Sequence, residues 1–314
     1  MNSMMKHHLK DKAIWVVLVI LCIAFSVANN RFLMLNNLFT LARQVSMYGI
    51  ASIGMIFVIL IAGIDLSTGT IITLVNILCS HFMVNMGMNI YMAVLCSLII
   101  STLIGTLNGL MIATIGMPAI ISTFASQTVF EGVAYLISGG KPIFGFDERF
   151  KMLGQGYIGL VPVPVIIMIV CFAIGSFILN KTYFGRYFYA VGGNESAAML
   201  SGIRVARVKY LIYALSGFFA GLSGIVLLSR TNSGQPTAGK GWEFDVITCV
   251  VLGGVSVSGG SGKVSNVVAG VLIIGVLKNG MILMNVNAYA QMIVQGIILA
   301  LAVGFDCWQK KSVV

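Results

Sequence analysis

Long apolar segments that carry almost no charge follow one another along the whole chain. Of the 314 residues, 58% are hydrophobic and only 9% are charged, with a mean hydropathy of +1.00. A soluble domain carries about 25% charged residues, whereas a helix of about 20 apolar residues spans the hydrocarbon core of a bilayer. We therefore predict an all-α polytopic membrane protein in contact with the lipid bilayer, with residues 1–314 forming a single membrane domain.

Apolar runs bounded by charges, glycines or prolines predict about ten transmembrane helices, within a range of roughly eight to ten. All five prolines fall at or between the ends of these runs, where a missing N–H group is tolerated. The predicted segments are residues 13–28, 45–62, 68–84, 90–115, 118–138, 163–180, 209–229, 245–259, 265–284 and 288–305.

The distribution of Lys and Arg predicts the orientation, because cytoplasmic segments carry an excess of these residues. With ten spans, the N-terminal tail (residues 1–12), the 181–209 connection and the C-terminal tail lie on one side. That side holds 11 positive charges, against 7 on the other. We therefore expect both termini in the cytoplasm. The first segment ends in a small-x-small pattern typical of signal peptides, but we expect it to be retained as an insertion signal.

The net charge of +10 does not indicate a nucleic-acid partner, since the basic residues are scattered singly through the loops rather than gathered on one face. Five of the six cysteines lie inside apolar stretches, and none has the spacing of a metal-ligand pair. We expect neither a disulfide nor a bound metal.

Two Gly- and Ser-rich segments predict interrupted helices. Residues 60–69 align without gaps to residues 251–260, and both close a predicted outside-to-inside span. Such interruptions at corresponding places in two halves indicate a transport pathway, because the freed backbone groups need a cavity or protein partners. We therefore expect broken helices in two related halves. A second similarity, between residues 103–107 and 273–277, places its members in oppositely directed helices and is not assigned to this repeat.

Polar residues inside the apolar spans are candidates to line the pathway, since intramembrane charges by default face a cavity or a partner. Asp65 lies at the predicted helix break, and its alternative role is a helix cap at the membrane edge. Lys278 either lines the cavity or reaches the outer surface along its aliphatic stem. Neutral amides exchange hydrogen bonds with sugar hydroxyls without burying a charge. The predicted pathway residues are Asp65, Ser67, Asn76, Asn108, Gln127, Glu131 and Asn279.

The 181–209 connection contains a short predicted helix outside the membrane. Asn194 is suited to cap it, Glu195 suits its first turn, and Gly202 can end it in a left-handed conformation. We expect Ala197 and Ala198 to form an exposed small face that lets a partner approach the backbone. The alternative is a solvated, positively charged loop without a partner.

The run Ala190–Ala198, followed by Ser201-Gly202-Ile203, resembles the coupling loop of the permease subunits of ribose-type monosaccharide ABC importers. The similarity extends from about residue 32 to about residue 306, and five motifs occur in the family's order. The other four are Gly63–Ser67, Gln235–Gly239, Val251–Gly254 and Tyr289–Ile293. One departure is Glu131-Gly132, where many relatives are expected to have Arg-Gly.

The resemblance implies that two permease subunits, identical or not, form the pore. An ABC ATPase subunit binds the cytoplasmic loops, and an extracytoplasmic binding protein delivers the sugar. ATP and Mg are then used by the ATPase chain, and this chain binds no cofactor. The residues implied to couple the two chains are Gly192, Gly193, Asn194, Glu195, Ala197, Ala198, Ser201, Gly202 and Ile203.

The segment from Gly259 to Lys263 superficially resembles a phosphate-binding loop. The pattern requires Gly where Val257 stands and Ser or Thr where Val264 stands. We therefore expect a tight turn here and no nucleotide site.

Together these features predict the pore subunit of an ATP-driven importer for a monosaccharide or related polyol, in the cytoplasmic (inner) membrane of a bacterium. No catalytic residue is expected. The alternative is an ion-coupled secondary transporter in which Asp65 or Glu131 carries a proton. A membrane enzyme is disfavoured by the sparse acids and the three histidines. The identity of the sugar is left open.

Overall fold

The computed structural model describes residues 3–311, and side chains from residue 13 to residue 308. The lysines of the two tails, which contribute to the predicted orientation, lie outside the residues with described side chains. The helices are α1 (Ser3–Ala28), α2 (Leu35–Leu60), α3 (Thr68–Val84), α4 (Ile90–Ala113), α5 (Ala119–Ser138), α6 (Glu148–Gln155), α7 (Val163–Lys181), α8 (Tyr183–Gly193), α9 (Glu195–Leu200), α10 (Val205–Thr231), α11 (Trp242–Leu252), α12 (Val264–Leu283) and α13 (Ala288–Lys311). A hairpin of two short strands, β1 (Tyr157–Ile158) and β2 (Val161–Pro162), separates α6 from α7.

The protein is an all-helical polytopic membrane protein. In the part that the structure describes, seven helices are long and apolar enough to cross a bilayer: α2, α4, α5, α7, α10, α12 and α13. The apolar part of α1 and the whole of α3 are shorter. Each predicted span corresponds to one helix, but the structure also contains α6, α8 and the hairpin, which the apolar-run analysis did not predict.

Four predicted segments were wrong in extent. The helix α1 begins at Ser3 rather than at residue 13, and α13 ends at Lys311 rather than at residue 305; α2 and α11 also differ. The 45–62 segment is helical from Leu35, because its polar first turns continue the helix beyond the apolar run. The 245–259 segment is an eleven-residue helix from Trp242 to Leu252. It ends at a glycine pair in which Gly254 adopts a positive φ of 78°, which stops a helix. At 1.5 Å per residue, α11 is about 16 Å long, roughly half of a bilayer core.

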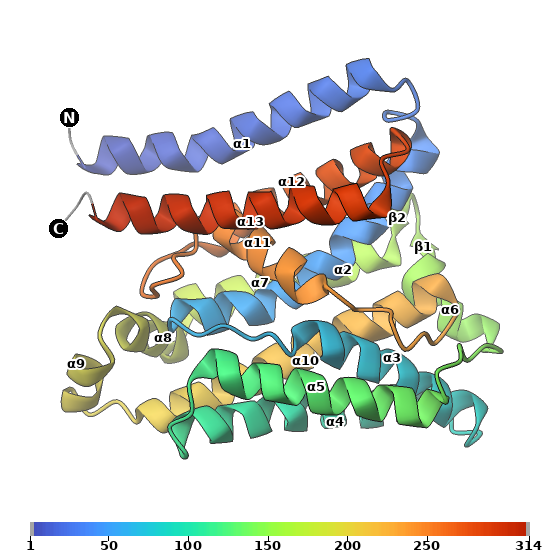
Figure 1. Ribbon diagram of the computed structural model, residues 1–314, viewed down its shortest axis with the longest axis horizontal. Helices are drawn as coiled ribbons and strands as arrows, with labels where there is room; N and C mark the ends of the chain where they lie inside the picture. Colours follow the sequence, from blue (N-terminus) through green and yellow to red (C-terminus); the bar gives the residue numbers. More distant parts are fainter. Residues whose placement is uncertain (1–2, 312–314) are drawn as a thin grey trace.

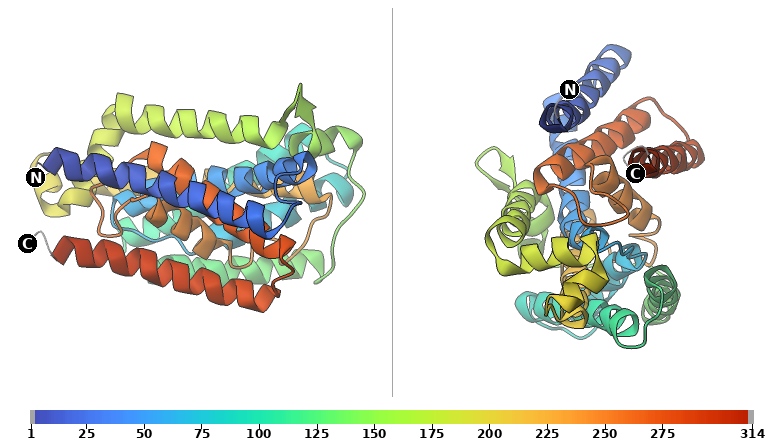
Figure 2. Two further views of the ribbon diagram at one scale, coloured as in Figure 1. Left: turned by 90° about the horizontal axis from the view of Figure 1, so that it is seen from above. Right: turned by 90° about the vertical axis from the view of Figure 1, so that its left-hand side faces the viewer.

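The helices lie side by side along one long axis (Figures 1 and 2). The central α2 and α10 are mostly buried, whereas α13 exposes its apolar surface along its length. Both ends of the described chain lie at the same end of the molecule as α8 and α9. The helix α6 and the hairpin lie at the opposite end (Figure 1).

Two connections turn back into the interior after a long helix. After α2, residues 61–67 run back toward the middle of the molecule, where α3 begins; after α10, residues 232–241 do the same before α11 (Figure 1). A left-handed residue follows each long helix: Ala62 with φ of 58° and Asn232 with φ of 52°. The structure thus contains two interrupted helices. The first interruption lies in the Gly- and Ser-rich segment 60–69, as predicted, whereas the second lies at residues 232–241 and not in the predicted segment 251–260.

The first turns of α3 and α11 meet inside the protein. A Cβ atom at Gly69 would overlap the Glu243 carboxylate and the carbonyl oxygen of Gly239, and a Cβ at Gly239 would overlap the carbonyl oxygen of Gly69. The Gly239 N–H also donates to Thr73 Oγ1 at 2.9 Å. Glycine at both positions therefore lets the two backbones touch, close to the positive ends of both helix dipoles.

Candidate functional site

Asp65 is the centre of a buried polar chain. Its Oδ1 accepts hydrogen bonds from the Ser67 N–H (3.0 Å) and hydroxyl (2.5 Å), and its Oδ2 accepts from the Ser216 hydroxyl at 2.7 Å. The Asn108 amide donates to Ser67 Oγ at 2.9 Å, and the Ser126 hydroxyl donates to Asn108 Oδ1. This chain links the 61–67 segment to α4, α5 and α10, so four of the elements around the break share one hydrogen-bond network.

Asp65 is fully buried, and no basic side chain pairs with it among the residues that the structure describes. Three hydrogen-bond donors stabilise its carboxyl group instead. The Tyr213 hydroxyl lies nearby against Gly63 and is buried without a hydrogen-bond partner. An unpaired hydroxyl beside a carboxyl group at a helix break is suited to exchange partners when the packing changes.

Asn76 and Asn279 lie outside this chain. Asn76 Oδ1 accepts from the Gln235 N–H at 2.8 Å, which ties α3 to the 232–241 connection, and its Nδ2 is buried without a partner. Asn279 pairs with the side-chain amide of Asn37 at 2.9 Å and links α12 to α2. The structure therefore brings together Asp65, Ser67 and Asn108 of the predicted pathway set, and separates Asn279 from them.

Gln127 and Glu131 belong to a second polar cluster at the start of α11. Gln127 Nε2 donates to Glu243 Oε1 at 3.2 Å, and Glu131 lies one helical turn farther along the same face of α5. Glu243 is buried, and its carboxylate also contacts the first turn of α3 at Gly69. The N-termini of α3 and α11 thus face the Glu243 carboxylate, and their helix dipoles stabilise its negative charge.

Lys278 is paired inside the protein, and its side chain is 18% exposed. Its Nζ forms an ion pair with Asp245 Oδ2, lies 3.2 Å from the Tyr48 hydroxyl and sits 5.1 Å from the centre of the Tyr48 ring. The apolar-run analysis missed Glu243 and Asp245 because it treated them as the boundary of a span. Two acids separated by one residue at the start of an apolar segment, with a lysine in the next span, would have indicated an intramembrane ion pair.

The predicted short helix is present as α9. Asn194 Oδ1 accepts a hydrogen bond from the Ala197 N–H at 2.9 Å, which makes it the N-cap, and Gly202 ends the turn with φ of 84°. Glu195 pairs with Lys209 at 2.7 Å, so the helix is attached to the first turn of α10. Together α8 and α9 form a structured helical pair at the end of the molecule that also carries the termini (Figure 1).

The prediction that Ala197 and Ala198 are both exposed was wrong for Ala198. Ala197 is exposed, but Ala198 is only 4% exposed, because α9 packs against α8 and the start of α10. The face of α9 that is free for a partner includes Met199 (63% exposed) and Leu200 (88% exposed). An arginine at position 198 would therefore disturb the fold of the isolated chain.

Glycines bring the end of α8 into backbone contact with the end of α2. A Cβ at Gly192 would overlap the Leu60 carbonyl oxygen, and the Gly260 N–H donates to the same oxygen at 2.8 Å. The Tyr189 hydroxyl donates to the Gly262 carbonyl at 2.8 Å. The segment that superficially resembles a phosphate loop is instead a packed turn between α8 and α2. Five residues after Leu60, the chain reaches Asp65.

The chain matches the family model described as branched-chain amino acid transport system / permease component over residues 37–303. It is 45% identical over 297 residues to a ribose import permease protein of Bacillus subtilis strain 168, covering 94% of this chain and 91% of the relative. It is 39% identical over 302 residues to a ribose import permease protein of Escherichia coli K12, covering 95% and 94%.

An L-arabinose transport system permease protein of Escherichia coli K12 is 39% identical over 297 residues, covering 95% of this chain and 90% of the relative. No solved structure gives a significant match. The similarity to the sugar permeases therefore extends over almost the whole chain, including both interrupted helices and the α8–α9 pair.

Proposed function

This chain belongs to the ribose-type permeases of ABC importers, and from that premise we propose how its helices carry out monosaccharide import. As a permease of this family it is a multi-pass inner-membrane protein and a transport subunit rather than an enzyme. In the proposed complex, two permease chains form the pore, an ABC ATPase docks on α9, and an extracytoplasmic binding protein delivers the sugar. ATP and Mg are used by the ATPase, and this chain binds neither a cofactor nor a metal.

The observation that carries the proposal is the backbone contact between Gly192 and Leu60. A displacement of α9 by the ATPase acts on α8, and the contact passes it to the end of α2 and the 61–67 segment. There it changes the packing around Asp65, whose partners come from α4, α5 and α10 through Ser67, Asn108 and Ser216. ATP binding drives this change only if the ATPase binds the two packings with different affinities.

The proposed topology places both termini, α8 and α9 in the cytoplasm. It counts ten membrane segments. Of these, α3 and α11 each begin inside the membrane after a connection that turns back, and α11 is about half a span long. The shared location of the termini and α9 in Figure 1, together with the excess of Lys and Arg in those segments, supports this orientation. Residues 1–314 then form a single transmembrane domain with residues 181–209 as its coupling segment.

Two halves of opposite orientation are supported by a shift of 170 positions. This shift relates the left-handed Ala62 to Asn232 and Gly69 to Gly239. It carries the bounds of α2, α3, α4 and α5 onto α10, α11, α12 and α13 within about four residues. The same shift aligns residues 103–107 with residues 273–277. These two segments lie in oppositely directed helices, which is the arrangement expected in an inverted repeat.

The first alignment, of residues 60–69 with 251–260, relates segments at the same end of the molecule that touch through Leu60 and Gly260. This alignment therefore supports a contact between two similar segments at one end of the molecule. The proposed halves are described instead by the shift of 170 positions.

The proposed function is tested in proteoliposomes that contain the permease, its ATPase and the binding protein. We expect ribose uptake to require ATP and to persist when a proton ionophore abolishes the proton gradient. A vesicle with an imposed proton gradient but no ATP serves as the control and is expected to take up no sugar. Uptake that follows the gradient without ATP would instead establish a proton-coupled transporter.

Replacing Asp65 by asparagine is expected to lower uptake by about tenfold or more, while the protein still assembles. The amide keeps the size of the side chain but replaces one acceptor oxygen with a donor, which faces the donating hydroxyls of Ser67 or Ser216. Uptake and complex assembly are measured side by side. Thr40→Ala is the matched control, since its hydroxyl bonds only within α2. Unchanged uptake in Asp65→Asn would leave Asp65 with a purely structural role.

A further inference from the structure

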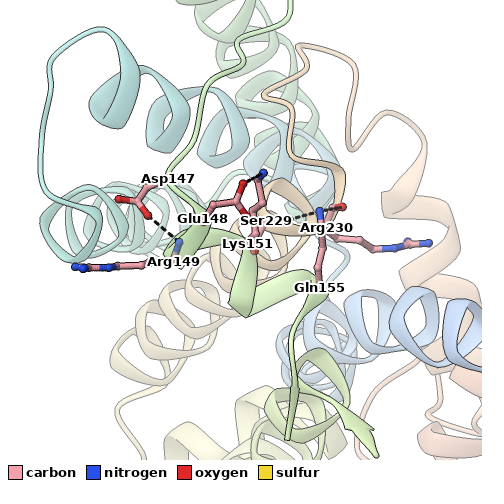
Figure 3. Close-up of polar contacts among 7 residues, drawn as sticks. All are labelled: Asp147, Glu148, Arg149, Lys151, Gln155, Ser229 and Arg230. Carbon is pink, nitrogen blue, oxygen red and sulfur yellow. Dashed lines mark hydrogen bonds and ion pairs between the residues drawn. The ribbon is translucent and has the colours of Figure 1, made fainter.

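The helix α6 is attached to the second interrupted helix at its break. The Ser229 hydroxyl donates to the Phe150 carbonyl at 2.6 Å and accepts from the Gly154 N–H at 2.7 Å. The Gln155 amide donates to the carbonyl oxygens of Ser229 (3.3 Å) and Arg230 (3.0 Å). Figure 3 shows Gln155, at the end of α6, beside Ser229 and Arg230 in the last turn of α10.

A second attachment lies on the far side of the same break. Ile143 and Gly234 form an isolated antiparallel bridge, with both N–H···O bonds at 2.8 Å. The segment from Ile143 to Gln155 therefore holds the chain before and after the left-handed Asn232. From there the chain continues through residues 235–241 to α11, which carries Glu243 and Asp245.

The contact of α6 with the end of α10 resembles the contact of α8 with the end of α2, at the opposite end of the molecule. A Cβ at Gly154 would overlap the Arg230 amide, as a Cβ at Gly192 would overlap the Leu60 carbonyl. Leu60 and Arg230 are related by the shift of 170 positions. Each interrupted helix is thus held at its break by a short helix outside the membrane, α8 at one end of the molecule and α6 at the other (Figure 1).

We propose that α6 is an outer coupling helix, through which the docked binding protein acts on the 230–241 connection and on the acids at the start of α11. This inference rests on the proposed function. One face of α6 is buried through Phe150 and Gly154, and the other exposes Glu148, Arg149 and Met152. Exposed Phe144 and Leu160 flank it. Arginine, methionine and aromatic residues are the types enriched at protein interfaces, so the exposed face fits a soluble protein partner.

The test is the stimulation of ATP hydrolysis in the reconstituted permease–ATPase complex as ribose-loaded binding protein is titrated. Gln155→Leu removes the two bonds to the α10 carbonyls from an exposed side chain, and Ser229→Ala removes the two bonds at the buried face. For both variants we expect the maximal stimulation to fall by about tenfold, with an unchanged half-saturating concentration of binding protein.

Arg149→Glu, on the exposed face, is expected to change the half-saturating concentration of binding protein rather than the maximal stimulation. The half-saturating concentration rises because docking is weakened, and the maximal stimulation is unchanged. Ser138→Ala is the matched control: its hydroxyl lies at the outer end of α5, and its bonds are to Tyr135 and Gly140 in and beside that helix. This control is expected to behave as the wild type.

Wild-type maximal stimulation in both Gln155→Leu and Ser229→Ala would overturn the role of α6. The role of α6 would also be overturned if these variants lost ATP hydrolysis to the same extent with and without binding protein. In that case α6 would have a structural or lipid-contacting role. A wild-type complex that the binding protein does not stimulate would instead overturn the proposed function itself.

Discussion

Replacing Lys278 by methionine is expected to destabilise the permease by about 3–5 kcal/mol, because it leaves the buried Asp245 without its ion pair. Asp245 Oδ2 is paired with Lys278, and its Oδ1 has no hydrogen-bond partner. After the substitution, no cation pairs with this carboxylate among the residues that the structure describes. The measurement is thermal unfolding of the purified protein in detergent.

The double variant Lys278→Met with Asp245→Asn removes both charges and is expected to recover most of the lost stability. Lys151→Met is the matched control, since it breaks the Glu148–Lys151 pair at the protein surface, where Glu148 is 84% exposed. Exposed pairs contribute about 0–1 kcal/mol, so this variant is expected to unfold like the wild type. Equal unfolding of Lys278→Met and Lys151→Met would show that the intramembrane pair does not stabilise the fold.

Replacing Ala197 by arginine is expected to weaken binding of the ATPase by about 100-fold while the permease itself still folds. Ala197 is exposed on α9 beside Met199 and Leu200, so the long side chain finds room in the isolated chain. At a docked interface the same side chain holds the two backbones apart and buries a charge. A loss of about 3 kcal/mol lowers the affinity by about 100-fold. Co-purification of the ATPase and sugar-dependent ATP hydrolysis measure the effect.

Two other arginine variants separate docking from folding. Ala28→Arg places the same side chain on an exposed site at the opposite end of the molecule, and normal ATPase binding is expected there. Ala198→Arg is expected to lower the yield of folded permease, because Ala198 is buried where α9 packs against α8 and the start of α10. ATPase binding by Ala197→Arg at the wild-type level would exclude α9 as the docking helix.

Apolar runs bounded by charges and glycines were enough to locate every long helix, because a bilayer leaves few alternatives for such segments. The Asn194 cap and the left-handed Gly202 were also predictable, since both depend on residues within one turn. The extent of α11 was not, because a helix of half a span is stabilised by its contacts with α2, α12, α13 and the first turn of α3 rather than by its own composition. The pairing of Asp245 with Lys278, 33 positions apart, depends on that same tertiary arrangement.

The difference between Ala197 and Ala198 shows a second limit. A helix as short as α9 has no periodicity from which to assign a buried face, and its orientation is set by Lys209 and the first turn of α10. Asn279 shows a related limit: an amide in an apolar span is equally suited to a sugar and to another amide, and in the structure Asn279 pairs with Asn37.

The backbone contact between Gly69 and Gly239 has a consequence for movement. Because neither residue has a side chain, no rotamer change can separate the first turn of α3 from the 232–241 connection. These two segments therefore part only when the backbone of one of them moves.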